Sequence, residues 1–205
     1  MDRSYRAPGG EAQAELREKG SRFGSIIQLV ADESDALEAI SIANKQFSDA
    51  THVCWAWRVG MPPRERCADA GEPAGTAGEP ILRVLRGAEL SDVLALVVRW
   101  YGGTKLGKGG LARAYSAATR LAMEQLEIIE KKPMVHLKLT LAYEQAGNVK
   151  RYLHSPDIEI IEQSYDDNQM EITFKLAESR RDELEEILAN SGADPTWLAP
   201  DQDEG

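Results

Sequence analysis

The stretch VLALVVRWYGGTKLGKGGLARAYSAATR, Val93 to Arg120, decides how the first half of this chain is built. It begins with a continuous apolar run, Val93–Trp100, which is typical of a central strand buried on both faces of a sheet. Two pairs of glycines and two lysines follow and lead into a segment with helical spacing. The stretch therefore predicts a buried strand, a glycine-rich loop and a helix from about Gly110 to Glu130.

The glycine-rich loop almost has the spacing of a nucleotide-binding phosphate loop. Gly102 is followed by four residues, Gly107 and Lys108, but Gly109 stands where such loops have the serine or threonine that binds magnesium. A phosphate-loop enzyme also needs a large parallel sheet, and only about 95 residues remain after the loop. We therefore exclude a nucleotide hydrolase.

The charge of this stretch makes it a candidate surface for an anion. It holds five basic side chains, and no acidic residue occurs from Val93 through Met123. Glycines let a ligand approach the backbone, and a helix N-terminus attracts negative charge. The alternative is a turn that packs a helix against a strand, with its lysines merely solvated. The predicted anion- or nucleic-acid-binding residues are Arg99, Gly102, Gly103, Lys105, Gly107, Lys108, Gly109, Gly110 and Arg113.

A second glycine-rich segment, GEPAGTAGEP at Gly71–Pro80, lies in a long predicted loop over residues 60–79. Its glycines and prolines specify a defined backbone path. Turn chemistry alone explains most of the segment, so a structural loop is the favoured interpretation. The candidate residues for a second loop of the same site are His52, Glu72, Gly75, Thr76 and Gly78.

The remaining pattern of the first half predicts a sheet with helices. Residues 1–19 are polar and are interpreted as a lead-in to a domain over residues 20–133. The strand Val53–Val59 should alternate, with Trp55 and Trp57 in the core rather than on a base-stacking surface. The other predicted elements are a strand at Arg22–Val30, a helix capped by Ser34 with the apolar stripe Ala36, Ile40, Ala43 and Phe47, and a short helix at Pro80–Gly87.

The pattern changes after Pro133 to a clean alternation of apolar and polar residues. Strands are predicted at 135–141, 158–165 and 170–176, with helices over about 145–153 and after Ser179. This β-α-β-β-α order is most of a ferredoxin-like unit, so residues 134–205 are predicted to be a second, small domain. The whole chain is thus expected to have an α+β fold.

Charge differs between the two halves. The net charge is −10; residues 1–133 hold 18 basic and 18 acidic side chains, whereas residues 134–205 hold 6 basic and 16 acidic ones. Three histidines and two cysteines have no metal-ligand spacing, and no catalytic set or cofactor motif is found. No stretch is long enough to cross a bilayer and the N-terminus lacks an apolar signal region, so we expect a cytoplasmic protein.

Three motifs in this order, ATHVCWAWRVG, GEPAGTAGEPIL and VVRWYGGTKLGKGGLARAYSAA, make the chain similar to the Impact/YigZ family over nearly its whole length. The resemblance implies a first domain like the second domain of ribosomal protein S5. It also implies a two-domain layout like the fourth and fifth domains of elongation factor G. Eukaryotic members of the family restrain a translation-control kinase through protein contacts.

The chain departs from the family pattern at three places. Val53 stands where the family often has asparagine, Ala70 where it often has a second acid, and Glu79 where it often has a basic residue. The change at Glu79 removes a positive charge near the predicted anion-binding surface.

Three functions follow as hypotheses. The first is a non-enzymatic, translation-linked protein whose basic loop binds RNA or the ribosome. The second is a protein-interaction module, in which the same loop docks an acidic protein partner in translation control. The third, ranked lowest, is an enzyme on a small phosphorylated substrate, which requires His52, Asp69 and Glu72 to converge on one pocket.

Overall fold

A computed structural model describes residues 4–142, 149, 152–155, 158–166, 168–189 and 194–198. The chain divides into two compact units, one over Tyr5–Lys131 and one from Lys132 onward. Each unit combines helices with antiparallel strands, so the chain has an α+β fold in two parts.

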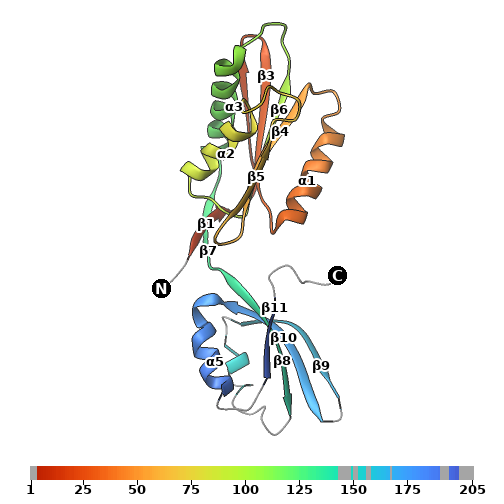
Figure 1. Cartoon of the computed structure of the whole chain (residues 1–205), viewed down its shortest axis with the longest axis vertical. Helices are drawn as coiled ribbons and strands as arrows, with labels where there is room; N and C mark the ends of the chain where they lie inside the picture. Colours follow the sequence, from red (N-terminus) through yellow and green to blue (C-terminus); the bar gives the residue numbers. More distant parts are fainter. Residues whose placement is uncertain are drawn as a thin grey trace. The chain divides into compact units, whose positions relative to one another are not determined.

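The first unit is built on a five-stranded antiparallel sheet in the order β2-β3-β6-β4-β5. Figure 1 shows α2 and α3 on one side of this sheet and α1 on the other. The strands are β2 (Ala12–Glu18), β3 (Ser21–Leu29), β4 (His52–Val59), β5 (Arg64–Ala68) and β6 (Val93–Trp100). The helices are α1 (Glu33–Gln46), α2 (Gly78–Gly87) and α3 (Gly107–Met123).

The central strand β6 confirms the prediction made from its apolar run. Every residue of β6 except Trp100 is buried, because helices cover both faces of the sheet at this strand. The predicted alternation of β4 is confirmed as well: Cys54 and Ala56 pack with α2 and α3, whereas Val53 and Trp57 pack with α1.

The prediction of a polar lead-in is wrong for residues 5–18, which form two strands. Tyr5–Pro8 forms β1, which pairs with β7 (Ile128–Lys131) as a separate two-stranded sheet, and the next strand is β2. The sequence pattern of β2 is weak, because two alanines, Ala12 and Ala14, and only one larger apolar residue, Leu16, supply its inward face between exposed polar neighbours.

Three other boundaries differ from the sequence predictions. The helix α3 ends at Met123 rather than near Glu130, because the chain turns there and then forms β7 over Ile128–Lys131. The predicted long loop contains β5, an edge strand whose polar side chains concealed it. The cap of α1 is Asp32 rather than Ser34, and its side chain accepts a hydrogen bond from the Asp35 amide at 2.8 Å.

The second unit is built on a four-stranded antiparallel sheet in the order β11-β8-β10-β9. The predicted alternation is confirmed in its two central strands, which bury Leu137, Leu139 and Leu141 on one and Met170, Ile172, Phe174 and Leu176 on the other. The predicted helix over about 145–153 lies largely outside the described residues. The elements are β8 (Met134–Ala142), β9 (Ile158–Tyr165), β10 (Gln169–Ala177), the short η1 (Glu178–Arg180), α5 (Arg181–Ala189) and β11 (Asp194–Leu198).

Candidate anion-binding surface

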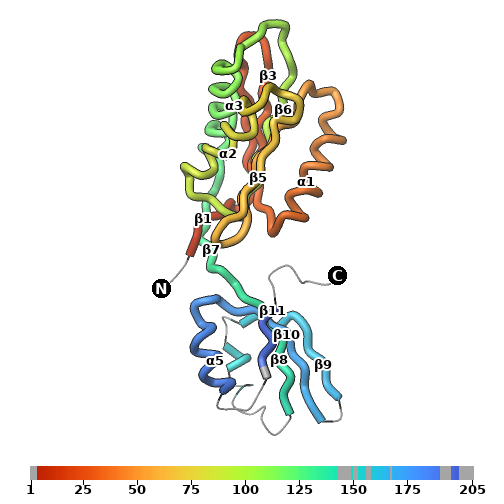
Figure 2. Tube along the Cα trace, in the orientation of Figure 1, coloured from red at the N-terminus to blue at the C-terminus, as the bar shows by residue number. Residues whose placement is uncertain are grey.

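The glycine-rich loop, residues 101–106, connects β6 to α3. The chain trace in Figure 2 shows this loop at the end of the first unit that is opposite β1 and β7. At its start, Gly102 packs directly on the backbone of Gly20. A Cβ atom on Gly102 would lie 1.9 Å from the carbonyl carbon and oxygen of Gly20, so no side chain fits there.

Hydrogen bonds from two segments fix the start of the loop: the first residue of β3 and the residue just before β4. The Ser21 hydroxyl oxygen accepts from the Gly102 amide at 3.2 Å, and the Thr51 hydroxyl oxygen accepts from the Tyr101 amide at 3.0 Å. The Thr51 amide in turn donates to the Arg99 carbonyl at 2.8 Å. We call Arg99–Gly102 the loop base; its backbone is held in place by the body of the unit.

Arg99 is buried, in contrast to its predicted role of contacting phosphate at the surface. Only 5% of the residue is exposed, and its Nη1 lies 2.5 Å from Oε1 of Glu72, which is also buried. Its Nη2 contacts the Ser21 hydroxyl at 3.4 Å. A charge inside a protein must be paired, and Glu72 neutralises this one. Arg99 thus joins the second glycine-rich loop to the loop base.

The Glu72 carboxylate extends this contact into a buried polar network. Tyr115 of α3 donates to Glu72 Oε1 at 2.9 Å, and the Cys54 sulfur lies 3.4 Å from the Tyr115 oxygen. Burial raises the pKa of Cys54 to about 12, so this thiol stays protonated and is a poor nucleophile. The network therefore joins α3, β4, β6 and the second loop from the inside.

Asp69 organises the second glycine-rich loop, a role that the sequence did not reveal. Its Oδ1 accepts from the amides of Ala77 and Gly78 at 2.8 and 2.9 Å, and its Oδ2 accepts from the Gly75 amide at 2.8 Å. Burial opposes ionisation, but these backbone donors outweigh it and hold the pKa of Asp69 below its ordinary value. The sequence does contain one signal for this role: Asp69 is an acidic residue that lies shortly before a glycine-rich turn and the start of a helix.

The candidate residues of the second loop serve structural contacts. The Thr76 hydroxyl donates to the Pro73 carbonyl at 2.7 Å. His52 Nδ1 lies 2.9 Å from the Ala70 carbonyl, which can only accept, so this nitrogen carries the proton. His52, Asp69 and Glu72 therefore each have separate partners. This arrangement does not support the convergent pocket that the enzyme hypothesis requires.

The other three basic residues that were predicted to bind an anion have a different environment. Lys105, Lys108 and Arg113 are all exposed, and within residues 4–142 none of them has a hydrogen bond or an ion pair. We call these three residues the loop tip. They lie just before α3 and in its first two turns; Leu106 offers this helix no side-chain cap, and the first turn holds no acid. Gly107, Gly109 and Gly110 belong to that first turn together with Lys108.

The described part of the chain contains neither a metal-ligand cluster nor a membrane-spanning helix. Among those residues, no group of three or more histidine, cysteine, aspartate or glutamate side chains is arranged to hold a metal ion. No described helix has both the length and the apolar character needed to cross a membrane.

Comparison with known proteins identifies the family. The model of the Impact N-terminal domain matches residues 19–123, which include both glycine-rich loops. The chain belongs to the IMPACT family. A second family model, a domain of unknown function (DUF1949), matches residues 139–193.

Relatives of this IMPACT family member match both of its units. It is 34% identical over 169 residues to the IMPACT family member YvyE of Bacillus subtilis (strain 168), covering 82% of this chain and 78% of that one. It is 35% identical over 150 residues to the IMPACT family member YigZ of Escherichia coli (strain K12), covering 72% and 74%. A crystal structure of a hypothetical protein aligns over 99% of this chain and 100% of its own, with 29% identity and a TM-score of 0.74.

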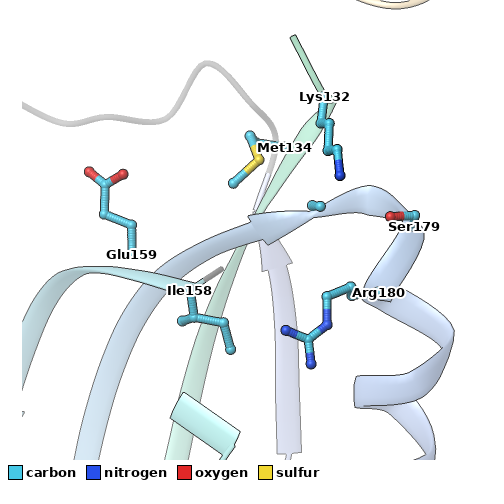
Figure 3. A pocket seen from close by; sticks show the side chains of 7 residues that line it. Lys132, Met134, Ile158, Glu159, Ser179 and Arg180 are labelled. Carbon is cyan, nitrogen blue, oxygen red and sulfur yellow. The ribbon is translucent and has the colours of Figure 1, made fainter. Parts of the chain in front are cut away.

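The second unit of the IMPACT family member has a cavity of about 400 Å³, drawn in Figure 3. Lys132, Ser179 and Arg180 line one side of it, and two cations beside a hydroxyl are a combination that could bind an anion. The Arg180 guanidinium, however, donates to Glu183 at 3.1 Å and to Ser155 at 3.0 Å. Because that cation is already engaged and Glu159 adds a negative charge to the lining, the loop tip remains the better candidate.

Proposed function

We propose that the protein is a non-enzymatic binding protein in translation or its regulation, and that the loop tip binds the phosphate backbone of RNA, free or in the ribosome. One observation carries the proposal: Lys105, Lys108 and Arg113 are exposed without an ionic partner in residues 4–142, at the uncapped start of α3. Membership of the IMPACT family supports the link to translation, which the resemblance of the three motifs also implies.

The geometry suits a phosphate chain rather than a small molecule. The loop base is held by the packing of Gly102 on Gly20 and by a hydrogen bond to the Gly102 amide, so this part of the backbone does not have to be ordered on binding. The tip itself is open and exposed. Three phosphate contacts predict a salt dependence of log K with a slope of about −2 for single-stranded RNA.

The finer assignments of fold and location belong to the same proposal. We infer that the first unit is similar to the second domain of ribosomal protein S5 and that the second is ferredoxin-like. The strand order β11-β8-β10-β9, with α5 after its third strand in the chain, supports the latter. We also propose that the protein acts in the cytoplasm, where ribosomes are found.

The experiment is cosedimentation with purified ribosomes and fluorescence anisotropy with a ribosomal RNA fragment, both over a range of salt concentrations. The double change Lys105→Glu and Lys108→Glu should abolish binding while circular dichroism stays unchanged. A matched pair compares the single change Lys105→Glu with the control Lys45→Glu. Lys45 is also exposed, but it lies on α1, which covers the sheet face opposite to α3. Absent or salt-insensitive binding, or equal loss in the two single variants, would refute the proposal.

A protein partner is the competing reading of the same surface. An acidic protein would contact the same loop tip and would also lose affinity at high salt. A pull-down from nuclease-treated lysate separates the two, because a partner that depends on the loop tip and survives nuclease favours protein interaction. Loss of all partners after nuclease favours RNA.

A further inference from the structure

The strand β9 forms an open edge of the sheet in the second unit. It pairs with β10 on one side and is last in the strand order β11-β8-β10-β9, so in the described chain its other side faces no strand. An open edge presents backbone donors and acceptors to any extended chain that approaches. Proteins usually protect such edges with charged side chains, prolines, β-bulges or short strands.

The other edges in this protein carry basic residues or a proline, whereas the only charged residues of β9 are acidic. The edge strands β2 and β5 contain arginines, and β11 contains Pro195. The sequence of β9, IEIIEQSY, has neither a basic residue nor a proline. It also exposes large apolar side chains: Ile160 is 45% exposed, Ile161 44% and Tyr165 60%. This edge therefore favours an added strand that brings apolar and basic side chains rather than acidic ones.

The register of β9 defines what each of its faces offers. Ile160 lies opposite Phe174 and Tyr165 opposite Met170, so both belong to the face on which β10 buries its apolar residues. A shift in register next to Phe174 leaves Ile161 without a partner. Apolar side chains of an added strand would pack beside Ile160 and Tyr165.

The opposite face of β9 is acidic. Glu159 lies opposite Lys175, with which it forms a 2.9 Å ion pair, and Glu162 lies opposite Thr173. Figure 3 shows Ile158 and Glu159 pointing in different directions from β9, as this alternation requires. A second copy of β9 added antiparallel would place its own acidic face beside this one, and like charges on one face of a sheet are unfavourable.

We propose that the β9 edge binds an extended segment of another protein that alternates apolar and basic residues and adds to the sheet as a fifth strand. The added backbone completes the hydrogen bonds of the edge. Its apolar side chains cover Ile160 and Tyr165, and its basic side chains face Glu159 and Glu162. This proposal is independent of RNA binding by the loop tip.

The first arm of the test uses a ten-residue synthetic peptide of alternating valine and lysine, titrated into the full chain. Fluorescence anisotropy should detect saturable binding, and hydrogen exchange should show new protection of β9 amides. A peptide of the same sequence with alternate amides N-methylated has the same charge but cannot complete the strand pairing. If it binds equally well, or if neither peptide binds, the proposal is wrong.

The second arm uses variants at exposed positions, which should leave the fold intact. Glu162→Lys should weaken the valine–lysine peptide by roughly fivefold or more, because an attractive cross-strand pair becomes repulsive. The matched control Glu124→Lys, on an exposed residue of the first unit, should leave the affinity unchanged. Equal effects of the two variants would overturn the proposal. So would self-association of the unbound chain through β9, measured by sedimentation.

Discussion

The base and the tip of one loop use the same kind of side chain in opposite ways. Arg99 and Lys105 are six positions apart in an acid-free segment, and both are cations. Arg99 is buried against Glu72 at 2.5 Å, whereas Lys105 is exposed and has no ionic partner in residues 4–142. The difference teaches that burial, rather than charge in a sequence window, decides which cation is available to a ligand.

The physical reason lies in desolvation. A guanidinium that loses its water must be compensated inside the protein, and once Glu72 compensates it, little of its field reaches a phosphate outside. A solvated ammonium keeps its charge available, although salt screens it.

The change Arg99→Ala should lower the free energy of unfolding by about 3–5 kcal/mol, because it leaves the Glu72 carboxylate buried without its cation. Urea denaturation measures this loss. The double change Arg99→Met and Glu72→Leu should lose less than the sum of the two single changes, since it removes both charges. Additive losses would contradict the ion pair as the cause.

The change Gly102→Ala should destabilise the protein by about 3 kcal/mol, because the new Cβ would overlap the Gly20 backbone. Gly103→Ala is the matched control: its φ of +87° is strained for alanine, but no atom lies within 4 Å of the new Cβ. We expect a loss of about 1–2 kcal/mol there. Thermal unfolding of the two variants compares them, and an equal loss would show that the contact with Gly20 does not matter.

The pKa of Asp69 makes its contribution depend on pH. Because this pKa is lower in the folded state, the stabilisation is present above the unfolded value of about 4 and disappears as pH falls through the folded value. Asp69→Asn should therefore cost about 1–2 kcal/mol at pH 7 and progressively less in acid. Denaturant midpoints between pH 7 and 3 measure the difference, and a constant gap across that range would contradict the assignment.

Charge reversal at the loop tip should have the smallest effect on folding. Lys105→Glu and Lys108→Glu together should change the free energy of unfolding by within about 0.5 kcal/mol, because both side chains are exposed. A glutamate in the first turn of α3 even complements the helix dipole. Differential scanning calorimetry measures the change, and a loss larger than 2 kcal/mol would mean that the tip also holds the fold together.

The fold could largely be predicted where hydrophobic periodicity is strong. The apolar run of β6 could be recognised because both faces of this strand are covered. The alternation of β8 and β10 could be recognised because one face of each strand is buried. The edge strands and the very short strands could not be predicted in this way. The edge strands β2 and β5 carry polar or small residues, and β1 and β7 have only four residues each.

The candidate site could be predicted only in part. Its glycines, its lysines and the helix start after Leu106 follow from the local sequence. The partner of Arg99 lies 27 residues earlier, and Tyr115 reaches Glu72 from 43 residues later. Such pairings depend on how β6, α3 and the second loop pack together, and no spacing rule indicates them.

The sequence by itself determined the two-part organisation, the central strand and the absence of acids from Val93 to Met123, since these depend on local composition and period. Only the tertiary structure decided which charged side chains are buried and paired and which are exposed. It buried Arg99 against Glu72, engaged Asp69 with loop amides and left the loop tip in solvent. The reason is that the free energy of a charge depends on the atoms around it, and those atoms come from distant parts of the chain.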